Sequence, residues 1–455
     1  MASSKIYGYL PNDTPEYGKL ALLGFQHVIT MFPATVLVAL LCGFHVSTVL
    51  FASGVSTIVA LVLSRRGIGK FIPLFYGSSF SYIAAYTGIV QAITGKPPAF
   101  GTPASNEVIS TMQAGIVATG ILNILVGYAI KSLGKKVIDN ILPPIITGSI
   151  ACVIGFGLGF SALDMALTVV KGYWGIALIT LLATVAFSYL LQGKGFLGMI
   201  PILLGAIVGY IATLIFAPGF IKFDGITSAA LIQPPNITLP NFTSPLVGTA
   251  IFSIAVMALA TIPESTAHLY QMSLYVDQLA DDQNHERYHL DKHIGFNLIL
   301  DGIGDFLNGL LGATAGTNYG ENNSLMAITR NYSGPALIAA GVIAILLSFL
   351  GPFTALVNSV PVFVSGGLAI YLFGVIGMQG IALMQSSKVN LFDPLELAIG
   401  ATIMVIGIGG NIGFPGGLLP ITIPTLFPQG LPAIATAAVV GILMNLVFRA
   451  IRKNS

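Results

Sequence analysis

The stretch Ala313–Arg330, which reads ATAGTNYGENNSLMAITR, interrupts a chain that consists largely of apolar segments. It opens with small and turn-forming residues, carries one acid, Glu321, and then has a helical pattern as far as Arg330. Broken backbone and a carboxyl group are both costly at membrane depth, because lipid offers them no hydrogen-bond partners. We therefore expect this stretch to form one half of a binding site for a small planar molecule.

The composition places the chain among polytopic membrane proteins. Of its 455 residues, 55% are hydrophobic and only 8% are charged, whereas soluble domains carry about 25% charged residues. The net charge of +2 gives no reason to expect a nucleic-acid partner. Cys42 and Cys152 lie in apolar runs, so they are expected to be buried thiols and not part of a disulfide framework.

Hydropathy over windows of about 20 residues predicts fourteen membrane spans, three of which are weaker because Gly, Pro or polar residues interrupt them. The clear spans are expected at residues 19–43, 46–64, 111–131, 145–161, 173–191, 196–216, 247–270, 336–357, 359–384, 395–413 and 431–450. The weaker spans are expected at residues 71–90, 293–312 and 314–332. The predicted fold class is therefore an all-α polytopic membrane protein.

The basic residues predict the orientation of these spans. With the N-terminus inside, only Lys96, Lys171 and Lys222 of the 19 lysines and arginines fall in outer segments. By the positive-inside rule, both termini are expected to be cytoplasmic, in a multi-pass protein of the cell inner (cytoplasmic) membrane. Residues 1–18 are polar and lack the apolar core of a signal peptide, so they are expected to form a cytoplasmic N-terminus.

Two motifs occur twice in the chain. The run LPPIITGSIA from Leu142 resembles VPVFVSGGLA from Val360, and YGSSF from Tyr76 resembles YGENN from Tyr319. Seven predicted spans separate the members of each pair, and an odd number means that the two copies are inverted in the membrane. Inverted repeats with matching interruptions are typical of transporters whose site lies where the repeats meet. The sequence thus predicts seven plus seven inverted spans.

The interruption in the first copy lies at residues 71–90. Pro73 disfavours helix in the residue before it, and Gly77 suits a turn. A helix is expected to begin near Ser78 or Ser79, because Ser is a favourable N-cap. With the second copy breaking at Tyr319, two helix N-termini would face each other and present N–H groups to a carbonyl oxygen or an anion. The alternative is a pair of helices that are merely kinked.

The eighth span contains Pro263, with Glu264 directly after it and His268 one helical turn after Glu264. Proline bends a helix and frees a carbonyl group, and residues four apart share a helix face. Ionisable residues inside a membrane usually serve function, so this pair is a candidate site for gaining and losing protons. The alternative is a structural hydrogen-bonded pair.

Three further polar positions lie in predicted spans. Asp301 and Asp305 share one face of the ninth span and either bind a cation or brace the broken segments beside them. His27 is interpreted as a hydrogen-bonding contact between helices, although a functional role stays open. The run GFGLG from Gly155 lies inside a span and is interpreted as a helix-packing surface rather than a nucleotide loop. No metal-binding cluster is expected within the spans.

The one strongly polar loop, DQLADDQNHERYHLDK at 277–292, is different. His285, His289 and His293 occur there at helical spacing and could bind a metal. We favour a solvated face, which is the usual role of a charge-rich run.

The sequence resembles the nucleobase–cation symporter-2 family, also called nucleobase–ascorbate transporters, and within it the bacterial uracil permeases. The resemblance extends over nearly the whole chain, from GFQHVITMFPATVLV at Gly24 to the last span. Its most specific parts are YGSSF at Tyr76, the Glu264/His268 pair and the signature beginning at Thr317. In that signature Glu321, Asn322, Thr329 and Arg330 fit the family pattern, whereas Ser324 replaces the usual Gly.

The resemblance implies a division of the chain into two domains, with short strands in broken spans 3 and 10. A core domain would comprise residues 19–138 (spans 1–4) and 247–358 (spans 8–11). A gate domain would comprise residues 139–246 (spans 5–7) and 359–455 (spans 12–14 and a short cytoplasmic C-terminus). Substrate would bind between the two domains.

The resemblance also implies roles for individual residues. Glu264 and Glu321 would accept hydrogen bonds from ring N–H groups. Backbone N–H groups of Phe80 and Gly320 would meet a carbonyl oxygen. His268 would lie beside Glu264 in a proton path. The resemblance places further site residues as follows: Tyr319 and Ser79 line the substrate site, and Asn322 binds a cation or is structural.

The function implied is import of uracil by proton symport, with alternating access of the core against the gate domain. The acid Glu321 favours uracil over purines, whose carriers more often have Gln there. The alternatives are a purine or xanthine permease of the same family and an anion transporter or channel of similar architecture. No enzyme activity and no cofactor are expected beyond the co-transported H⁺. Coupling to Na⁺ and a homodimer both stay open.

Overall fold

The computed structural model describes residues 8–134, 140–167, 171–192, 194, 197–198, 200–221, 223–424 and 427–454. Seven residues of the expected cytoplasmic N-terminus, 1–7, lie outside the described residues, as does Lys222 of the outer segments. Cys42 and Cys152 are both buried free thiols, as predicted.

Helices form most of the described chain. The first half contains α1 (Tyr17–Cys42), α2 (Val46–Ile68), α3 (Ile83–Thr94), α4 (Asn106–Leu133), α6 (Pro144–Gly157), α7 (Gly159–Leu167), α8 (Trp174–Leu190), α9 (Pro201–Phe216) and α10 (Phe223–Thr227). The second half contains α11 (Val247–Ala255), α12 (Ala258–Asp282), α13 (Ile294–Leu311), α14 (Gly320–Thr329), α15 (Gly334–Ser348), α16 (Gly351–Asn358), α17 (Val362–Ser386), α18 (Pro394–Met404), α19 (Gly410–Gly413) and α20 (Ala433–Asn454). The strands are β1 (Tyr76–Ser78), β2 (Gly316–Asn318), β3 (Leu418–Leu419) and β4 (Leu431–Pro432).

Nine helical segments in the described part of the chain are long and apolar enough to cross a membrane, judged by length and composition. Three more apolar helices are shorter, namely α8, α9 and α15. A polytopic membrane protein is thereby confirmed. The count of fourteen spans stays a prediction, because several expected spans consist of two shorter helices or of a strand followed by a helix.

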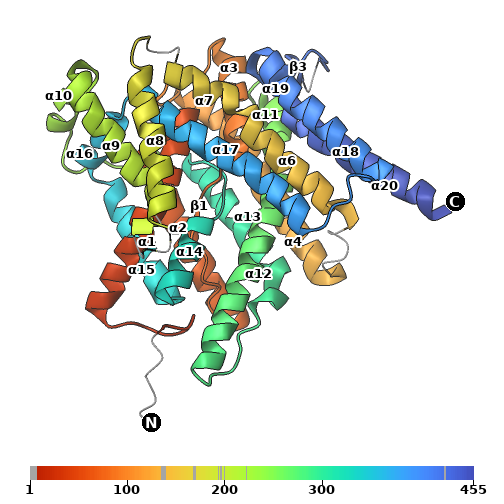
Figure 1. Cartoon of the computed structure of the whole chain (residues 1–455), viewed down its shortest axis with the longest axis horizontal. Coiled ribbons are helices and arrows are strands. Elements are labelled where there is room, and N and C mark those ends of the chain that lie inside the picture. Colours follow the sequence, from red (N-terminus) through yellow and green to blue (C-terminus); the bar gives the residue numbers. More distant parts are fainter. Residues whose placement is uncertain are drawn as a thin grey trace.

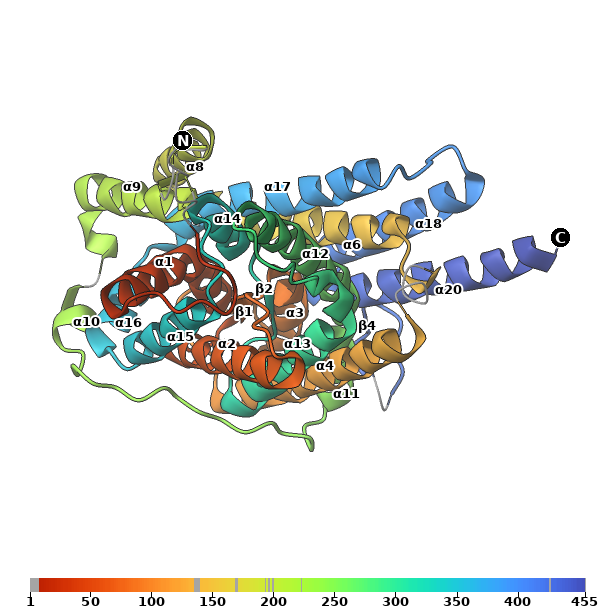
Figure 2. The ribbon, with the colours of Figure 1, turned by 90° about the horizontal axis from the view of Figure 1, so that it is seen from below.

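The helices pack in two groups. In one group α4, α13, α2, α15, α1 and α11 contact one another, and in the other α6, α17, α7, α8, α9, α18 and α20 do so. Figure 1 shows α17 and α6 side by side, with α18 and α20 beyond them and α12, α13 and α14 below. Figure 2 shows the two groups as neighbouring blocks, with β1 and β2 inside the block formed by the first group.

Glycines allow the helices within each group to approach closely. A Cβ atom on Gly302 of α13 would lie 2.5 Å from the carbonyl oxygen of Gly120 in α4. In the second group, a Cβ atom on Gly380 of α17 would lie 2.5 Å from the carbonyl oxygen of Gly148 in α6. Gly155 lies against Gly377 in the same way, which confirms that its run is a helix-packing surface. Small residues at helix interfaces are a usual means of association in membranes.

The two interrupted segments meet as a pair of short strands. β1 and β2 are antiparallel, with Tyr76 opposite Asn318 and Ser78 opposite Gly316. The chain leaves β2 directly into α14, but it leaves β1 through a 3₁₀ turn, Phe80–Tyr82, before α3. The predicted start of the first helix near Ser78 was therefore early, because Ser78 pairs within the strand. The two helix starts lie at opposite ends of a strand pair only three residues long.

The bend in the eighth predicted span also differs from expectation. The chain breaks at Val256 and Met257, between α11 and α12, whereas Pro263 lies inside α12. The amide groups of Leu259 and Ala260 bond to carbonyl groups three residues earlier, which tightens this turn. A proline ring clashes with the carbonyl group four residues before it, so its effect reaches the preceding turn.

Candidate functional site

Asp305 fixes the strand pair from α13. Its Oδ1 accepts hydrogen bonds from the hydroxyl of Tyr76 at 2.6 Å and from the amide of Gly316 at 2.7 Å. Its Oδ2 accepts a bond from the amide of Asn123 in α4 at 2.9 Å. Both strands and two helices therefore converge on one fully buried carboxyl group.

Asp301, one turn earlier on α13, belongs to a second polar network. Its Oδ2 accepts hydrogen bonds from the hydroxyl of Ser265 on α12 and from the amide of Asn318 on β2 at 3.3 Å. Ser265 Oγ in turn accepts bonds from Asn297 and Asn318, both at 2.8 Å. This network attaches the end of β2 to α12 and α13.

These contacts bear on the two roles left open for Asp301 and Asp305. Each carboxyl group accepts bonds from groups that hold the strands, which is the bracing arrangement. Among the described residues, the one group of three metal-ligating side chains lies in another part of the molecule. Asn123 and Asn297 were missed by the sequence reasoning, although lone amides in apolar helical runs are a usable signal.

Tyr319, which directly follows β2, packs against β1. Its ring lies against Gly77, where a Cβ atom would collide with it. Its hydroxyl donates to the carbonyl oxygen of Ser78 at 2.9 Å and lies 2.8 Å from the hydroxyl of Thr35 in α1. The side chain is buried, so in this structure Tyr319 connects the second broken segment to the first.

His27 contacts the second broken segment through Asn322. The amide of Asn322 lies 3.1 Å from Nδ1 of His27 and donates to the carbonyl oxygen of His27 at 3.1 Å. Both residues are buried. This is the contact between helices that was favoured for His27, and it gives Asn322 a structural partner.

Glu264 and Glu321 differ from the two aspartates in having uncommitted carboxyl groups. Both are half-buried, and they lie close enough for their charges to interact. Among the described residues, neither carboxyl group accepts a hydrogen bond from another residue. Two neighbouring acids that receive no hydrogen bond from another residue are costly in an apolar setting unless a ligand or a proton satisfies them.

His268 lies beside these acids and against the start of α14. Its Nδ1 is 2.8 Å from the carbonyl oxygen of Asn318, and a Cβ atom on Gly320 would lie 3.1 Å from its Nε2. Glycine at this position therefore lets the imidazole approach the backbone where the helix begins. His268 therefore lies against the second broken segment, which the spacing of Glu264 and His268 alone does not predict.

The first backbone amides of the 3₁₀ turn and of α14 differ in their hydrogen-bond acceptors. Ser79 caps the 3₁₀ turn, because its hydroxyl accepts a bond from the amide of Ser81 at 3.2 Å. At the start of α14, Tyr319 makes no side-chain cap, so the Gly320 amide has no acceptor within that helix, whereas the Glu321 amide donates to its own carboxyl group. Phe80 begins the 3₁₀ turn and is half-buried.

Unpaired polar atoms gather in the second broken segment. Thr317 Oγ1, Asn322 Oδ1 and both amide atoms of Asn323 are buried without a hydrogen-bond partner among the described residues. Buried polar groups are nearly always paired, so such atoms are candidates for contacts with water or ligand. Ser324, at the position where the family pattern has Gly, is exposed and bonds to the carbonyl oxygen of Gly320 at 3.0 Å.

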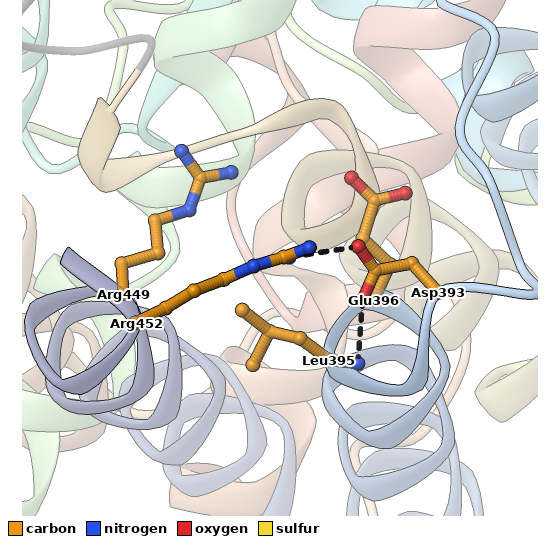
Figure 3. Close-up of a pocket in the computed structure, with 5 residues that line it drawn as sticks. All are labelled: Asp393, Leu395, Glu396, Arg449 and Arg452. Atoms are coloured by element: carbon orange, nitrogen blue, oxygen red, sulfur yellow. Dashed lines mark hydrogen bonds and ion pairs between the residues drawn. The ribbon is translucent and has the colours of Figure 1, made fainter. Parts of the chain in front are cut away.

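A charged cleft of about 280 Å³ lies between α18 and α20 (Figure 3). Its lining residues are distant in the sequence from Glu264 and Glu321. Arg452 forms an ion pair with Asp393 at 2.9 Å, and this contact lowers the pKa of the Asp393 carboxyl group. Asp393 also caps α18 by accepting a bond from the amide of Leu395. These contacts join the ends of two helices, and no site residue predicted from the sequence lies there.

Comparisons with known proteins agree with the resemblance noted in the sequence. The sequence profile described as "Permease family" matches residues 18–416. The chain is 32% identical over 444 residues to the uracil permease of Bacillus caldolyticus, covering 96% of this chain and 93% of that protein. It is 33% identical over 441 residues to the uracil permease of Escherichia coli (strain K12), covering 94% and 91%.

A solved structure shares the architecture. The transmembrane domain of a cyanobacterium bicarbonate transporter, BicA, superposes with a TM-score of 0.59 at 13% identity, covering 96% of this chain and 99% of that one. At this identity the likeness concerns the fold alone. The profile match and the relatives above 30% identity indicate common descent. These related proteins are named permeases, which are transporters rather than enzymes. The chain belongs to the permease family.

Proposed function

We propose that this protein is a nucleobase transporter that imports uracil across the cytoplasmic membrane. The observation that carries the proposal is the pair of uncommitted carboxyl groups, Glu264 and Glu321, beside the uncapped start of α14. Two relatives at 32% and 33% identity are named uracil permeases, which supports the same substrate.

The chemistry of uracil matches this arrangement. One edge of the ring alternates N–H donors with carbonyl acceptors. Glu264 and Glu321 would accept from the ring N–H groups, and the backbone amides of Gly320 and Phe80 would donate to a ring oxygen. Asn323 would add amide groups to the same wall. A shielded site rejects an analogue that leaves one of these polar groups unpaired, which gives it selectivity.

The proposed architecture has fourteen spans as seven plus seven inverted repeats, with both termini cytoplasmic. The packing of the helices in two groups supports a core domain around the strand pair and a gate domain beside it. Transport would follow from rocking of the core against the gate, which exposes the site to each side in turn. A homodimer is compatible with this scheme and is not needed for it.

We propose that the coupling ion is a proton. Glu264 would bind a proton together with uracil, and His268 would pass protons between this carboxyl group and the cytoplasm. The bonds that Asp301 and Asp305 make to the strands support a bracing role over a sodium site. Na⁺ coupling is the alternative outcome of the test below.

The test is uptake of labelled uracil by liposomes that contain the purified protein. An inward proton gradient should drive accumulation, a protonophore should abolish it, and a sodium gradient alone should not replace it. Unlabelled xanthine, guanine and urate should compete poorly. Preferred transport of a purine would indicate the purine branch of the family. Bicarbonate or sulfate flux without uracil flux would indicate the anion transporter that the fold also permits.

A further inference from the structure

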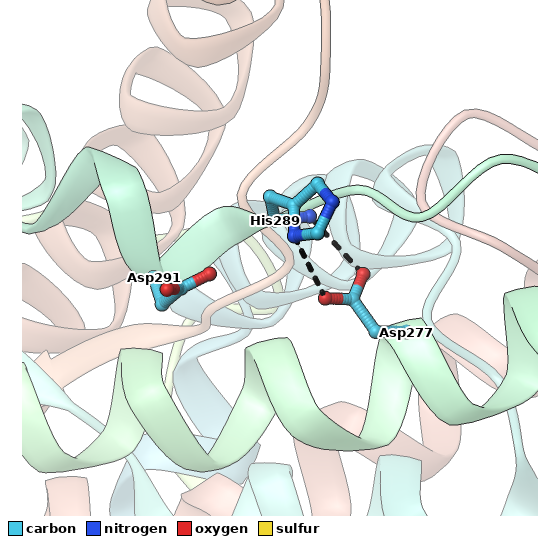
Figure 4. A group of neighbouring side chains, drawn as sticks. All are labelled: Asp277, His289 and Asp291. Atoms are coloured by element: carbon cyan, nitrogen blue, oxygen red, sulfur yellow. Dashed lines mark hydrogen bonds and ion pairs between the residues drawn. The ribbon is translucent and has the colours of Figure 1, made fainter.

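Three metal-ligating side chains meet where α12 connects to α13, outside the proposed transport site. Asp277 lies near the end of α12, and His289 and Asp291 lie on the connection that follows. One ligand atom from each of the three lies within 4.8 Å of the others. Figure 4 shows the imidazole of His289 directed toward the carboxylate of Asp277, with Asp291 on the other side.

Hydrogen bonds hold each carboxylate by one oxygen. Asp277 Oδ1 accepts from the amides of Tyr288 at 2.7 Å and of His289 at 3.1 Å. Asp291 Oδ1 accepts from the hydroxyl of Ser273 at 3.1 Å, and the amide of Asp291 donates to that hydroxyl at 3.1 Å. Outer bonds of this kind orient the carboxylates that bind metals in proteins. The carboxylates are thus held by Tyr288 and Ser273, which lie outside the cluster, and by the amide of His289 within it.

The remaining atoms are suited to a cation. Asp277 Oδ2 lies 3.7 Å from Nδ1 of His289, which is too long for a hydrogen bond. A neutral imidazole and two carboxylate oxygens form a mixed nitrogen and oxygen set with two negative charges. Divalent transition metals such as Zn²⁺ accept such ligands, at distances near 2 Å from the metal. Small side-chain movements would bring the three atoms within that reach.

We propose that Asp277, His289 and Asp291 bind a divalent transition-metal ion of the Zn²⁺ type, with water completing its coordination. The ion would connect the end of α12 to the start of α13. Glu264 and His268 lie on α12, and Asp301 and Asp305 lie on α13. The metal would therefore stabilise the position of α12 relative to α13. This cluster differs from the histidine set suggested by sequence spacing, since His285 and His293 are not part of it.

The test is calorimetric titration of Zn²⁺ into full-length protein in detergent, purified without a histidine tag and stripped with a chelator. Wild type should bind one ion per chain, and His289→Gly should bind it at least about tenfold more weakly. Glycine is the suitable replacement because His289 has φ of 49°, in the left-handed region that glycine tolerates. His285→Ala, an exposed histidine of the same loop, is the matched control and should bind as wild type does.

Stability gives a second measurement. Zn²⁺ should raise the melting temperature of wild type and of His285→Ala, but not of His289→Gly or Asp291→Asn. The proposal is overturned if wild type shows no saturable binding, which would leave His289 and Asp277 as an ion pair only. It is equally overturned if His289→Gly binds Zn²⁺ as tightly as wild type, or if His285→Ala loses as much affinity.

Discussion

The two broken segments have the same plan but different chemistry. The first passes from β1 through a turn capped by the Ser79 hydroxyl, and residues 71–90 contain no Asp, Glu, His, Lys or Arg. The second passes from β2 straight into α14, has no side-chain cap, and brings Glu321 into its first turn. The repeat therefore preserves a geometry, namely a strand and a helix start. Its chemistry is concentrated in one copy, which is where a ligand would be distinguished.

Of the changes considered, replacing the Glu321 carboxylate should have the largest effect on uracil binding. Glu321→Gln replaces a charged acceptor for a ring N–H group by a neutral amide, and a hydrogen bond to a charged group contributes about 1.5–3 kcal/mol. Uracil affinity should fall roughly 10- to 100-fold. Calorimetric titration of uracil into the purified variant measures this loss, and uptake by liposomes should fall with it.

The matched control lies in the other copy. Ser78 occupies the place of Glu321 when YGSSF is aligned with YGENN, and its hydroxyl lies 2.6 Å from that of Thr314. Ser78→Ala should bind uracil almost as wild type does. Equal losses in the two variants would show that both copies recognise the substrate, and the asymmetry would be wrong.

Tyr76, which begins β1, and Tyr319, which directly follows β2, give a second comparison. Tyr76→Phe removes bonds to the Asp305 carboxyl group and to the carbonyl oxygen of Asp301. Tyr319→Phe removes a bond to the carbonyl oxygen of Ser78 and the contact with the Thr35 hydroxyl, both of which are neutral groups. Because one acceptor of Tyr76 is a carboxylate, its loss should cost about 1.5–3 kcal/mol, against about 1 kcal/mol for Tyr319. Thermal unfolding in detergent should show a lower melting temperature for Tyr76→Phe, and the reverse order would contradict the bracing role of Asp305.

The glycines of the second segment differ in what surrounds them. A Cβ atom on Gly316 would lie 2.6 Å from the carbonyl oxygen of Gly77, which belongs to the paired strand. On Gly320 it would meet only the end of the His268 side chain at 3.1 Å. Gly316→Ala should therefore cost about 1–3 kcal/mol by overpacking, more than Gly320→Ala.

Melting temperatures of the two variants measure this difference. Gly18→Ala is the control, because no atom lies within 4 Å of the added methyl group. If Gly320→Ala were the less stable of the two, the strand pair would not be the rigid part of the site.

These comparisons also show how far the sequence could lead. Pro73, Gly77 and the repeated YG motif were enough to locate both interruptions, because proline and glycine act on the local backbone. The spacing of Glu264 and His268 was enough to place them on one face. Both features depend on residues that are near one another in the chain.

The roles of the acids could not be obtained in the same way. Asp305 bonds to Asn123 and Tyr76, which are 182 and 229 residues away, so only the folded chain shows that its carboxyl group is committed. The pairing of Ser78 with Gly316 moved the first helix start along the chain, and nothing in the local sequence indicates that pairing. Long-range contacts of this kind separate the two aspartates, which brace the strands, from the two uncommitted glutamates.

The smallest expected effect concerns Ser79, which the family resemblance assigns to the substrate site and the structure uses as a cap. Ser79→Ala should lower the free energy of unfolding by about 1 kcal/mol. Ser79→Gly should lower it by only a few tenths of a kcal/mol. Because the hydroxyl is already bonded to the Ser81 amide, both variants should keep the uracil affinity of wild type. Melting curves and uracil titrations of Ser79→Ala and Ser79→Gly measure the two quantities separately. If both variants kept their melting temperatures but lost affinity, the hydroxyl would contact uracil. The first segment would then contribute a polar side chain to recognition, as the second does through Glu321.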